Sequence, residues 1–555
     1  MSKSKKKLRI IPLGGMGEIG KNITVFEYGE NIIVVDCGIA FPENEMLGVD
    51  LVIPDITYLI KNKDKIKGVI LTHGHEDHIG AIPYILKQIN IPVYGTRLTL
   101  GLLKNKLEEH GIVECTTLKT IKPTDEIKLG VFSIEFIRST HSIADCVALA
   151  IRSPVGVVVH TSDFKIDYTP IEEEPMDIAR LGELGREGVL LLMCDSTNIE
   201  RKGYTMSEST VGDSFEDIFV NAQGRILVAS FASNIHRIQQ VINAAVKYNR
   251  KVAVCGRSMD NVINVALELG YMTVPKGTII DVDQINKYPP ERLVILTTGT
   301  QGEPMSALSR ISSSDHKKVE INPGDLVVIS ATPIPGNEKL VFRVINDLFK
   351  KGAKVIYEEL ADIHVSGHAC QEELKLIHSI IKPKYFMPIH GEYRHLRQHS
   401  LMAQKLGMTA NNIFVMDIGN VLEINQDNAR IHGSVPSGYL LVDGLGVGDV
   451  GNIVLRDRKH LSEDGLIIVV VAMAKESSQV VSGPEIISRG FVYVRESEYL
   501  IEELREKAKS AMKKKKKKGK YDWNSIKSAI RDDLKNYIYK KTKRKPMILP
   551  IIIEI

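Results

Sequence analysis

The residues of this sequence that are best suited to chemistry lie in one short motif. His73, His75, Asp77 and His78 fall within the run HGHEDH, directly after the apolar stretch 68–72. Neutral imidazole nitrogens and carboxylate oxygens suit Zn²⁺ or Mn²⁺. Four such groups so close together cannot all bind one ion without leaving coordination positions unfilled, so the motif predicts two divalent ions. The alternative is a surface histidine cluster or a helix-capping network.

Further metal-ligand types occur much later in the chain, each at the end of an expected strand. His141 lies in STHS, Asp163 in TSDF and His390 in PIHG. Each of them alone would be unremarkable. Loops at one edge of a sheet converge to build a site, so we expect these three residues to join the first motif.

The elements that must position these residues are short strands alternating with helices, which predicts an α/β fold. In the first 200 residues, strands are expected at 23–28, 32–36, 68–72, 132–137, 156–160 and 189–193, with helices at 79–89 and 98–110. From about Ser207 the pattern becomes that of a parallel, doubly wound sheet, which indicates an inserted second α/β domain. Its expected strands are 225–230, 251–255, 293–298 and 326–330, with a helix at 235–248; a further strand at 385–390 follows the insertion.

The end of the chain reads as a connector followed by a small domain. Residues 433–449 are rich in Gly and Ser, which suggests a linker. Beyond it, a strand at 465–472, helices at 496–512 and 522–539, and the segment 546–555 predict one more domain. The lysine run 513–518 is typical of a solvated loop, with attraction to RNA or the ribosome as the alternative.

A glycine-rich segment near the N-terminus, PLGGMGEIG (residues 12–20), fits the spacing of a dinucleotide-binding loop. Such a loop must open a helix, however, whereas 23–28 is expected to be a strand. We therefore reject a dinucleotide site and expect a turn at the floor of the metal site.

Composition excludes several classes of protein. The 555 residues are 43% hydrophobic, which is enough for two or three domains. The longest apolar stretch, 466–474, is too short to span a bilayer, and no apolar signal segment follows the basic start, so we expect a cytoplasmic protein. Six cysteines without a CxxC pair argue against a disulfide framework or a thiolate zinc site. The net charge of +4 depends on lysines at 3–7 and 513–518, so any RNA path must be a local basic lining.

Taken together, these motifs resemble the metallo-β-lactamase fold of nucleic-acid-processing enzymes, in the branch with a β-CASP insertion. Asp195 in CDSTN and His368 in HVSGH belong to the same pattern. The chain is similar throughout to the bacterial ribonuclease J family, including SGPEIISRGFVYVRES (482–497) and the ending KPMILPIIIEI. The resemblance implies an αββα sandwich with an inserted β-CASP α/β domain and a small C-terminal α/β domain. The expected boundaries are 1–206 and 361–432 for the sandwich, 207–360 for the insertion, 433–459 for a linker and 460–555 for a C-terminal assembly domain.

The resemblance also sorts the ligands. It implies that His73, His75 and His141 hold one metal, that Asp77, His78 and His390 hold the other, and that Asp163 bridges them, with Glu76 pointing away. Zn²⁺ is the preferred ion and Mn²⁺ the alternative. The two ions would activate water and clamp the scissile phosphate.

Among the residues around the ligands, the family pattern suggests that Asp195 orients His390 and that His368 donates the leaving-group proton. Asp77 and His78 complete the expected catalytic set. An N-cap role for Asp195 and a core role for His368 are the alternatives. Two segments are expected to hold RNA phosphate, with ordinary helix caps as the alternative. They are Ser233, Asn234, Ile235 and His236, and then His364, Val365, Ser366, Gly367 and His368.

The expected function is that of a 5′-to-3′ exoribonuclease with endonuclease activity on single-stranded RNA, preferring 5′-monophosphate ends, in rRNA processing and mRNA decay. Expected partners are a second copy of the chain in a dimer or tetramer, a paralogue, and an RNA degradosome or the ribosome. A small-substrate hydrolase is disfavoured by the insertion, and a DNA-processing enzyme by His390. A partner subunit or scaffold without activity is disfavoured because every expected metal ligand is present.

Overall fold

The computed structural model describes residues 7–43, 45–171, 174–303, 305–333, 337–357, 362–474, 480–492, 497–514 and 523–555. The chain divides into two compact units, residues 1–40 with 52–440 and residues 41–51 with 441–555. Each unit is described by itself. None of the described helices has the length and apolarity needed to span a membrane.

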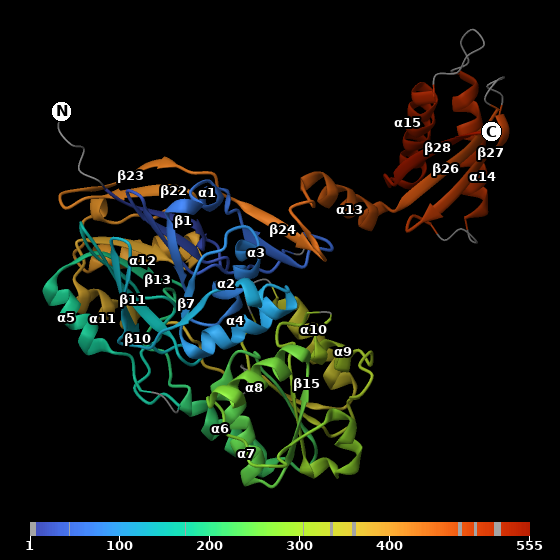
Figure 1. Ribbon diagram of the computed structural model, residues 1–555. Helices are drawn as coiled ribbons and strands as arrows, with labels where there is room; N and C mark the ends of the chain where they lie inside the picture. Colours follow the sequence, from blue (N-terminus) through green and yellow to red (C-terminus); the bar gives the residue numbers. More distant parts are fainter. Residues whose placement is uncertain are drawn as a thin grey trace, which may run out of the picture. The chain divides into compact units, whose positions relative to one another are not determined.

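The first unit contains a sandwich of two sheets (Figure 1). One sheet has the strand order β23 (Ala429–Ser434), β22 (Asn420–Ile424), β1 (Leu8–Gly14), β3 (Ile23–Tyr28), β4 (Asn31–Val35), β6 (Ile66–Ile70), β7 (Val93–Gly95), β8 (Leu118–Thr120). The other has the order β20 (Tyr385–Ile389), β13 (Val189–Asp195), β12 (Gly156–His160), β11 (Val147–Ser153), β10 (Phe132–Arg138), β9 (Glu126–Leu129). Their facing side chains form one buried core that includes Phe26, Ile33, Phe136 and Met387.

Helices cover the outer faces of the sandwich, as an αββα arrangement requires. Helices α5 (Ile178–Glu187) and α11 (Gln371–Ile381) pack on the second sheet, where Leu181 and Ile377 share a core with Phe386. Helix α12 (Tyr393–Lys405) contacts β20, and α4 (Arg97–Glu109) contacts β7 and β8 of the first sheet. Short helices α1 (Thr57–Lys61), α2 (Glu76–Ile79) and α3 (Ile82–Leu86) lie in the connections.

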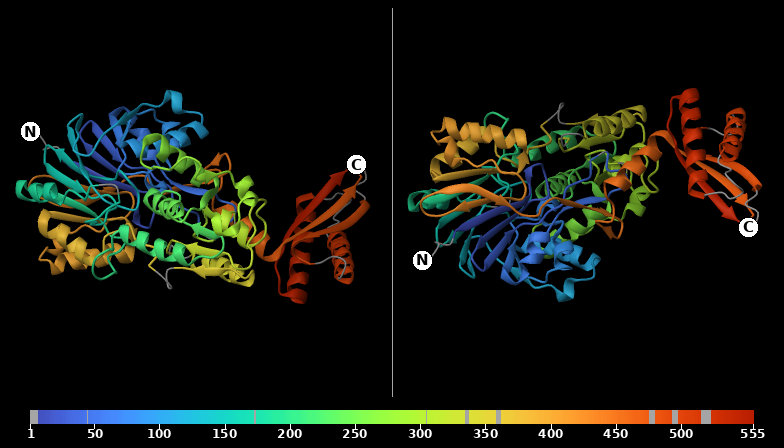
Figure 2. Two further views of the ribbon diagram at one scale, coloured as in Figure 1. Left: turned by 90° about the horizontal axis from the view of Figure 1, so that it is seen from below. Right: turned by 90° about the horizontal axis from the view of Figure 1, so that it is seen from above.

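The insertion forms a separate lobe of the same unit, drawn green to yellow in Figures 1 and 2. Its six strands are all parallel, in the order β16 (Ile279–Ile280), β15 (Lys251–Cys255), β17 (Leu293–Thr297), β14 (Ile226–Ala229), β18 (Leu326–Ile329), β19 (Lys354–Ile356). Its helices are α6 (Ser209–Asn221), α7 (Ile235–Lys247), α8 (Arg257–Leu269), α9 (Ala307–Ser312) and α10 (Glu338–Lys350). The expected doubly wound sheet is therefore present.

The second unit contains a three-stranded sheet with helices on one face. Strand β26 (Leu466–Met473) pairs antiparallel with β27 (Val480–Arg489) and parallel with β28 (Met547–Glu554). Alternate residues of β26, beginning with Ile467, are buried against α14 (Glu498–Lys514) and α15 (Trp523–Thr542). Most of the lysine run 513–518 lies outside the described residues.

Two expectations about elements need correction. The single helix expected at 79–89 is wrong, because the chain forms α2 and α3 with a break at Gly80 and Ala81. A Cβ at Gly80 would lie 2.6 Å from the Glu76 carbonyl oxygen, and a new helix begins at Ile82 with Pro83 in its first turn. The expected linker, 433–459, contains strands β24 (Tyr439–Asp443) and β25 (Gly446–Val447) and the start of α13 (Asn452–Asp464).

Candidate metal centre

All seven predicted metal ligands meet at one edge of the sandwich. His73, His75, Asp77 and His78 follow β6, His141 follows β10, Asp163 follows β12 and His390 follows β20. Their donor atoms form two groups, each with members within 4.8 Å of one another. The first donor set is His73, His75 and His141; the second donor set is Asp77, His78, Asp163 and His390.

The distances within the first donor set fit one ion. His75 Nδ1 lies 3.2 Å from His73 Nε2 and 3.1 Å from His141 Nε2. Nitrogen donors around a tetrahedral ion at 2.0–2.1 Å lie about 3.3–3.4 Å apart, close to these values. Burial lowers the pKa of all three rings, and that of His75 falls to about 4. Neutral imidazoles that converge in this way have free lone pairs for a cation.

The second donor set adds two carboxylates. His390 Nε2 lies 3.2 Å from Asp77 Oδ2 and 3.4 Å from Asp163 Oδ2. His78 Nε2 lies 3.2 Å from the same oxygen of Asp163. That oxygen is also 3.8 Å from both His73 Nε2 and His141 Nε2. A single Asp163 oxygen therefore faces both donor sets, as a bridging ligand must.

The second ring nitrogens of these histidines are held by the surrounding chain. Asp36 Oδ2 lies 2.8 Å from His78 Nδ1 and also accepts from Thr72 Oγ1. The Gly367 carbonyl lies 2.6 Å from His141 Nδ1. Such contacts fix the tautomer that directs Nε2 at a metal. The donor sets thus fit two divalent ions both in geometry and in ring orientation.

Backbone geometry shapes the same edge. Three non-glycine residues around the site, Asp36, Ser162 and His390, have φ between 53° and 59°, a region that L residues rarely adopt. Gly38 allows the closest approach, because a Cβ there would lie 1.6 Å from the Asp77 carbonyl oxygen. The strained positions lie at the ends of strands, where they turn ligands into the site.

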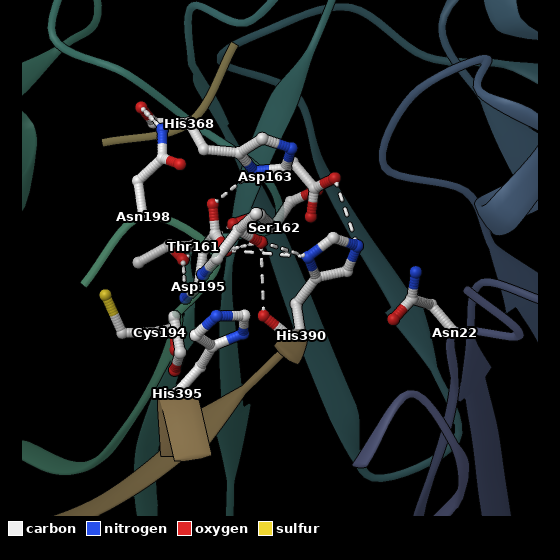
Figure 3. Close-up of polar contacts among 12 residues, drawn as sticks. Asn22, Thr161, Ser162, Asp163, Cys194, Asp195, Asn198, His368, His390 and His395 are labelled. Carbon is white, nitrogen blue, oxygen red and sulfur yellow. Dashed lines mark hydrogen bonds and ion pairs between the residues drawn. The ribbon is translucent and has the colours of Figure 1, made fainter. Parts of the chain in front are cut away.

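Asp195 lies beside the second donor set and contacts both His368 and His390 (Figure 3). Asp195 Oδ2 lies 2.7 Å from His368 Nδ1, whereas Asp195 Oδ1 is 3.5 Å from His390 Nδ1. The nearest partner of His390 Nδ1 is Thr197 Oγ1 at 2.7 Å, and that hydroxyl is also 2.8 Å from Asp195 Oδ1. Asp195 therefore reaches His390 both directly and through Thr197.

His368 lies next to the metal ligands, not in the core. Its ring centroid is 4.9 Å from that of His141 and 5.3 Å from that of His390. Burial lowers the pKa of His368, but Asp195 and Asp163 raise it above its ordinary value. A ring that holds a proton more readily than a free histidine is suited to proton donation. Glu76 points elsewhere, to Lys106 Nζ at 2.6 Å.

The two segments expected to hold phosphate are placed differently. In the first, Asn234 is the N-cap of α7 and accepts from the Arg237 backbone N–H at 3.0 Å, while Ile235 and His236 are buried. The backbone N–H groups at the start of α7 and the half-buried Ser233 hydroxyl are donors there. In the second, Gly367 holds His141 and Ser366 Oγ lies 2.8 Å from Asn198 Nδ2. Val365 is buried, whereas His364 is half-buried.

Some residues at the site were not expected to act there. Asp36 and Thr197 orient ligands, and Asn22 Nδ2 lies 3.1 Å from His78 Nε2. Their residue types are common at strand ends and helix caps, so no sequence signal separated them. The glycine-rich segment, in contrast, was placed correctly, because Gly14, Gly15 and Met16 line the same pocket as His390.

Comparison with known proteins places the chain in a family. Residues 16–159 match the family described as Metallo-beta-lactamase superfamily, and residues 223–348 match Ribonuclease J, beta-CASP domain. Residues 352–416 match Zn-dependent metallo-hydrolase RNA specificity domain, and residues 453–555 match Ribonuclease J C-terminal domain. Ribonuclease J2 of Bacillus subtilis is 47% identical, with all of both chains covered. The chain belongs to the ribonuclease J family.

Other relatives agree with this membership. Ribonuclease J 1 of Streptococcus pyogenes is 45% identical over 98% of this chain and 97% of its own length, and Ribonuclease J 2 of Staphylococcus aureus is 41% identical over both whole chains. Relatives named J 1 and J2 are about equally similar, so identity does not distinguish the two types. A crystal structure of an Enterococcus faecalis protein of unknown function matches with a TM-score of 0.54 at 17% identity, over 75% of this chain and all of that one. It supports the fold alone.

Proposed function

We propose that the protein is a ribonuclease that hydrolyses RNA phosphodiester bonds with two divalent ions, one in each donor set. The observation that carries the proposal is the single oxygen of Asp163 that faces both sets. Ions held by the two donor sets would supply a water molecule of lowered pKa and would stabilise charge on a phosphate. Membership of the ribonuclease J family supports the metal-dependent ribonuclease activity.

The protein's own residues supply proton transfer and orientation. His368 donates a proton to the leaving oxygen, and Asp195 keeps that ring oriented through the 2.7 Å contact. Thr197 and Asp36 hold His390 and His78. Zn²⁺ fits a set of three imidazoles best, and Mn²⁺ also fits the carboxylate-rich second set.

For the substrate, we propose single-stranded RNA that is degraded from its 5′-monophosphate end in the 5′-to-3′ direction. Cleavage at internal positions is a second proposed activity. The support is the loop 364–368, which lies against His141 and carries half-buried His364 within reach of solvent. The backbone N–H groups at the start of α7 add donors of the kind that bind phosphate.

The test is a time course on end-labelled RNA with 5′ hydroxyl, monophosphate or triphosphate, with and without chelator. The Asp77→Ala, His78→Ala protein should cut none of them and should bind one ion fewer by elemental analysis. An Asp64→Ala, His432→Ala protein, altered at exposed positions, is the matched control. Cleavage by the first variant at the wild-type rate would refute the proposal. DNA of the same sequence with a 5′ phosphate shows whether the activity is restricted to RNA.

We further propose that copies of the chain assemble through the C-terminal unit. On the sheet face opposite α14 and α15, exposed Leu549 lies beside half-buried Ile468, and exposed Ile551 lies beside half-buried Val470. Large exposed apolar patches mark interaction sites. The domain boundaries given above and a cytoplasmic location remain predictions.

A further inference from the structure

A fully buried arginine connects the two segments proposed to hold RNA phosphate. Arg237 lies in the first turn of α7 and is 0% exposed. Its NH1 is 3.1 Å from His364 Nδ1 and donates to the Ser330 carbonyl at 3.0 Å. Its Nε donates to Glu208 Oε1 at 2.8 Å. One guanidinium therefore spans the start of α7, the end of β18 and the loop that leads to His368.

The contact with Arg237 determines which nitrogen of His364 carries the hydrogen. A guanidinium has five N–H donors and no acceptor, and it stays charged. His364 Nδ1 can therefore face Arg237 only as an unprotonated acceptor, which places the ring hydrogen on Nε2. Nε2 has no hydrogen-bond partner among the residues that the structure describes. His364 thus has one free donor on a neutral ring.

The surrounding charges keep Arg237 in place. Glu208 is 3% exposed and accepts from both Arg237 and Asn234 Nδ2, the latter at 3.3 Å. Lys165 Nζ lies 3.8 Å from the other Glu208 oxygen and 3.4 Å from Asp167. Burial and the Arg237 charge lower the pKa of His364 to about 3. Two buried cations thus face two buried carboxylates, and the imidazole stays neutral.

We propose that Arg237, held by Glu208, is a positioning residue that sets the tautomer of His364, so that His364 Nε2–H donates to a phosphate oxygen at the RNA 5′ end. The inference rests on the proposed function, because it assigns His364 to the binding of a terminal phosphate. A neutral donor of fixed direction favours RNA that carries a terminal phosphate oxygen over RNA that ends in a hydroxyl.

The test is a double-mutant cycle between Arg237 and His364 in the full-length, metal-loaded protein. Arg237→Lys keeps the positive charge but loses the forked guanidinium, whereas His364→Gln removes the imidazole whose hydrogen Arg237 is proposed to direct. The measured quantity is the ratio of kcat/KM for 5′-monophosphate RNA to that for 5′-hydroxyl RNA. Each single variant should lower this ratio roughly tenfold, and the double variant should lower it no further than either single one. The proposal would be overturned if the double variant lowered the ratio by the product of the two single effects. It would also be overturned if the variants lowered kcat/KM equally for both RNAs.

Arg225→Lys is the matched control. Arg225 forms another buried ion pair of the inserted domain, with Asp325, at the opposite end of β14. Its substitution should lower the Tm and leave the substrate ratio unchanged. If Arg225→Lys changed the ratio as much as Arg237→Lys does, the effect of Arg237 would be one of general stability and the proposal would fail.

The tautomer can be measured without catalysis. NMR of ¹⁵N-histidine-labelled protein reports which ring nitrogen carries the hydrogen. The His364 signals are assigned as those that disappear in His364→Gln, and in the wild-type protein they should show a hydrogen on Nε2 and an unprotonated Nδ1. A hydrogen on Nδ1 would overturn the proposal. This readout separates two failures: a protein that cuts both RNAs equally well refutes the 5′-monophosphate preference, whereas the nitrogen signal tests the Arg237–His364 contact alone.

Discussion

Four donor histidines depend on a neighbour at the ring nitrogen that faces away from the donor sets. Thr197 serves His390, Asp36 serves His78 and the Gly367 carbonyl serves His141. Thr72 Oγ1 lies 3.1 Å from His73 Nδ1. The residues of the two donor sets could be predicted from the sequence, because four of the seven lie in one motif and the other three follow expected strands. These supporting residues could not, because a threonine or aspartate acquires its role only when the fold brings it to a ring.

Thr197→Val tests this dependence. The substitution keeps the shape of the side chain and removes the hydroxyl that contacts both His390 and Asp195. Metal affinity of the second donor set should fall roughly 10- to 100-fold, as for other residues that orient metal-bound histidines. Titration calorimetry with Zn²⁺ or Mn²⁺ measures it. Thr297→Val, a buried threonine of β17, should leave the affinity unchanged.

Glu208 gives a pH-dependent prediction. Burial alone would raise the pKa of Glu208, but Arg237 and Lys165 outweigh it and lower the pKa. The unfolded chain has a Glu pKa of about 4.3, so the carboxylate's contribution to stability is present above that pH and is lost as the pH falls through the folded pKa. Glu208→Gln should cost about 3–5 kcal/mol of unfolding free energy at pH 7, because it leaves Arg237 buried and unpaired.

Urea denaturation of both proteins at a series of pH values measures this difference. The cost of Glu208→Gln should shrink toward acid pH, where the wild-type carboxylate takes up a proton. A cost that stayed constant down to pH 3 would contradict the assignment of the ion pair.

At the scale of elements, the loop 364–368 connects the inserted domain to the metal site. Gly367 approaches His141 so closely that a Cβ would lie 2.6 Å from the ring Nδ1. The sequence indicated that this loop belongs to the site, but the reason for a glycine within it appears only in three dimensions. Strand β27 was not predicted from the sequence, because Gly483 and Pro484 interrupt the alternation of apolar and polar residues that indicates a strand.

Gly367→Ala should displace the His141 ring and weaken binding to the first donor set. We expect elemental analysis after dialysis to show the loss of about one ion per chain, with the fold retained by circular dichroism. Gly182→Ala in α5, where a Cβ meets nothing within 4 Å, is the control and should keep both ions. If Gly367→Ala kept both ions, the loop would have to shift to accommodate the Cβ without displacing the His141 ring, and the prediction would be wrong.

At the scale of the whole molecule, the fold class was predictable because strand and helix periods alternate clearly through the sandwich and the insertion. Which apolar residues of the C-terminal sheet are exposed was not predictable, because exposed apolar residues of one sheet face are indistinguishable in sequence from buried ones. In β28, Leu549, Ile551 and Ile553 are exposed, whereas Ile548 is buried.

Ile551→Lys should therefore lower the molar mass measured by light scattering toward that of one chain. The Tm should not fall. The ammonium group would be desolvated in an interface but solvated on a free chain. Val131→Lys, at an exposed apolar position of the first unit, should leave the mass unchanged. An unaltered mass for the Ile551 variant would place the contact between copies elsewhere.

The order of the ligands along the chain has a consequence during synthesis. The three histidines of the first donor set are complete by residue 141, whereas His390 follows the entire inserted domain. The second donor set therefore stays incomplete until the inserted domain has been synthesised, and so does the Gly367 support of His141. If the two donor sets act together as proposed, translation must pass through the inserted domain and reach His390 before the proposed centre can form, so a chain still being translated would be inactive toward its own messenger.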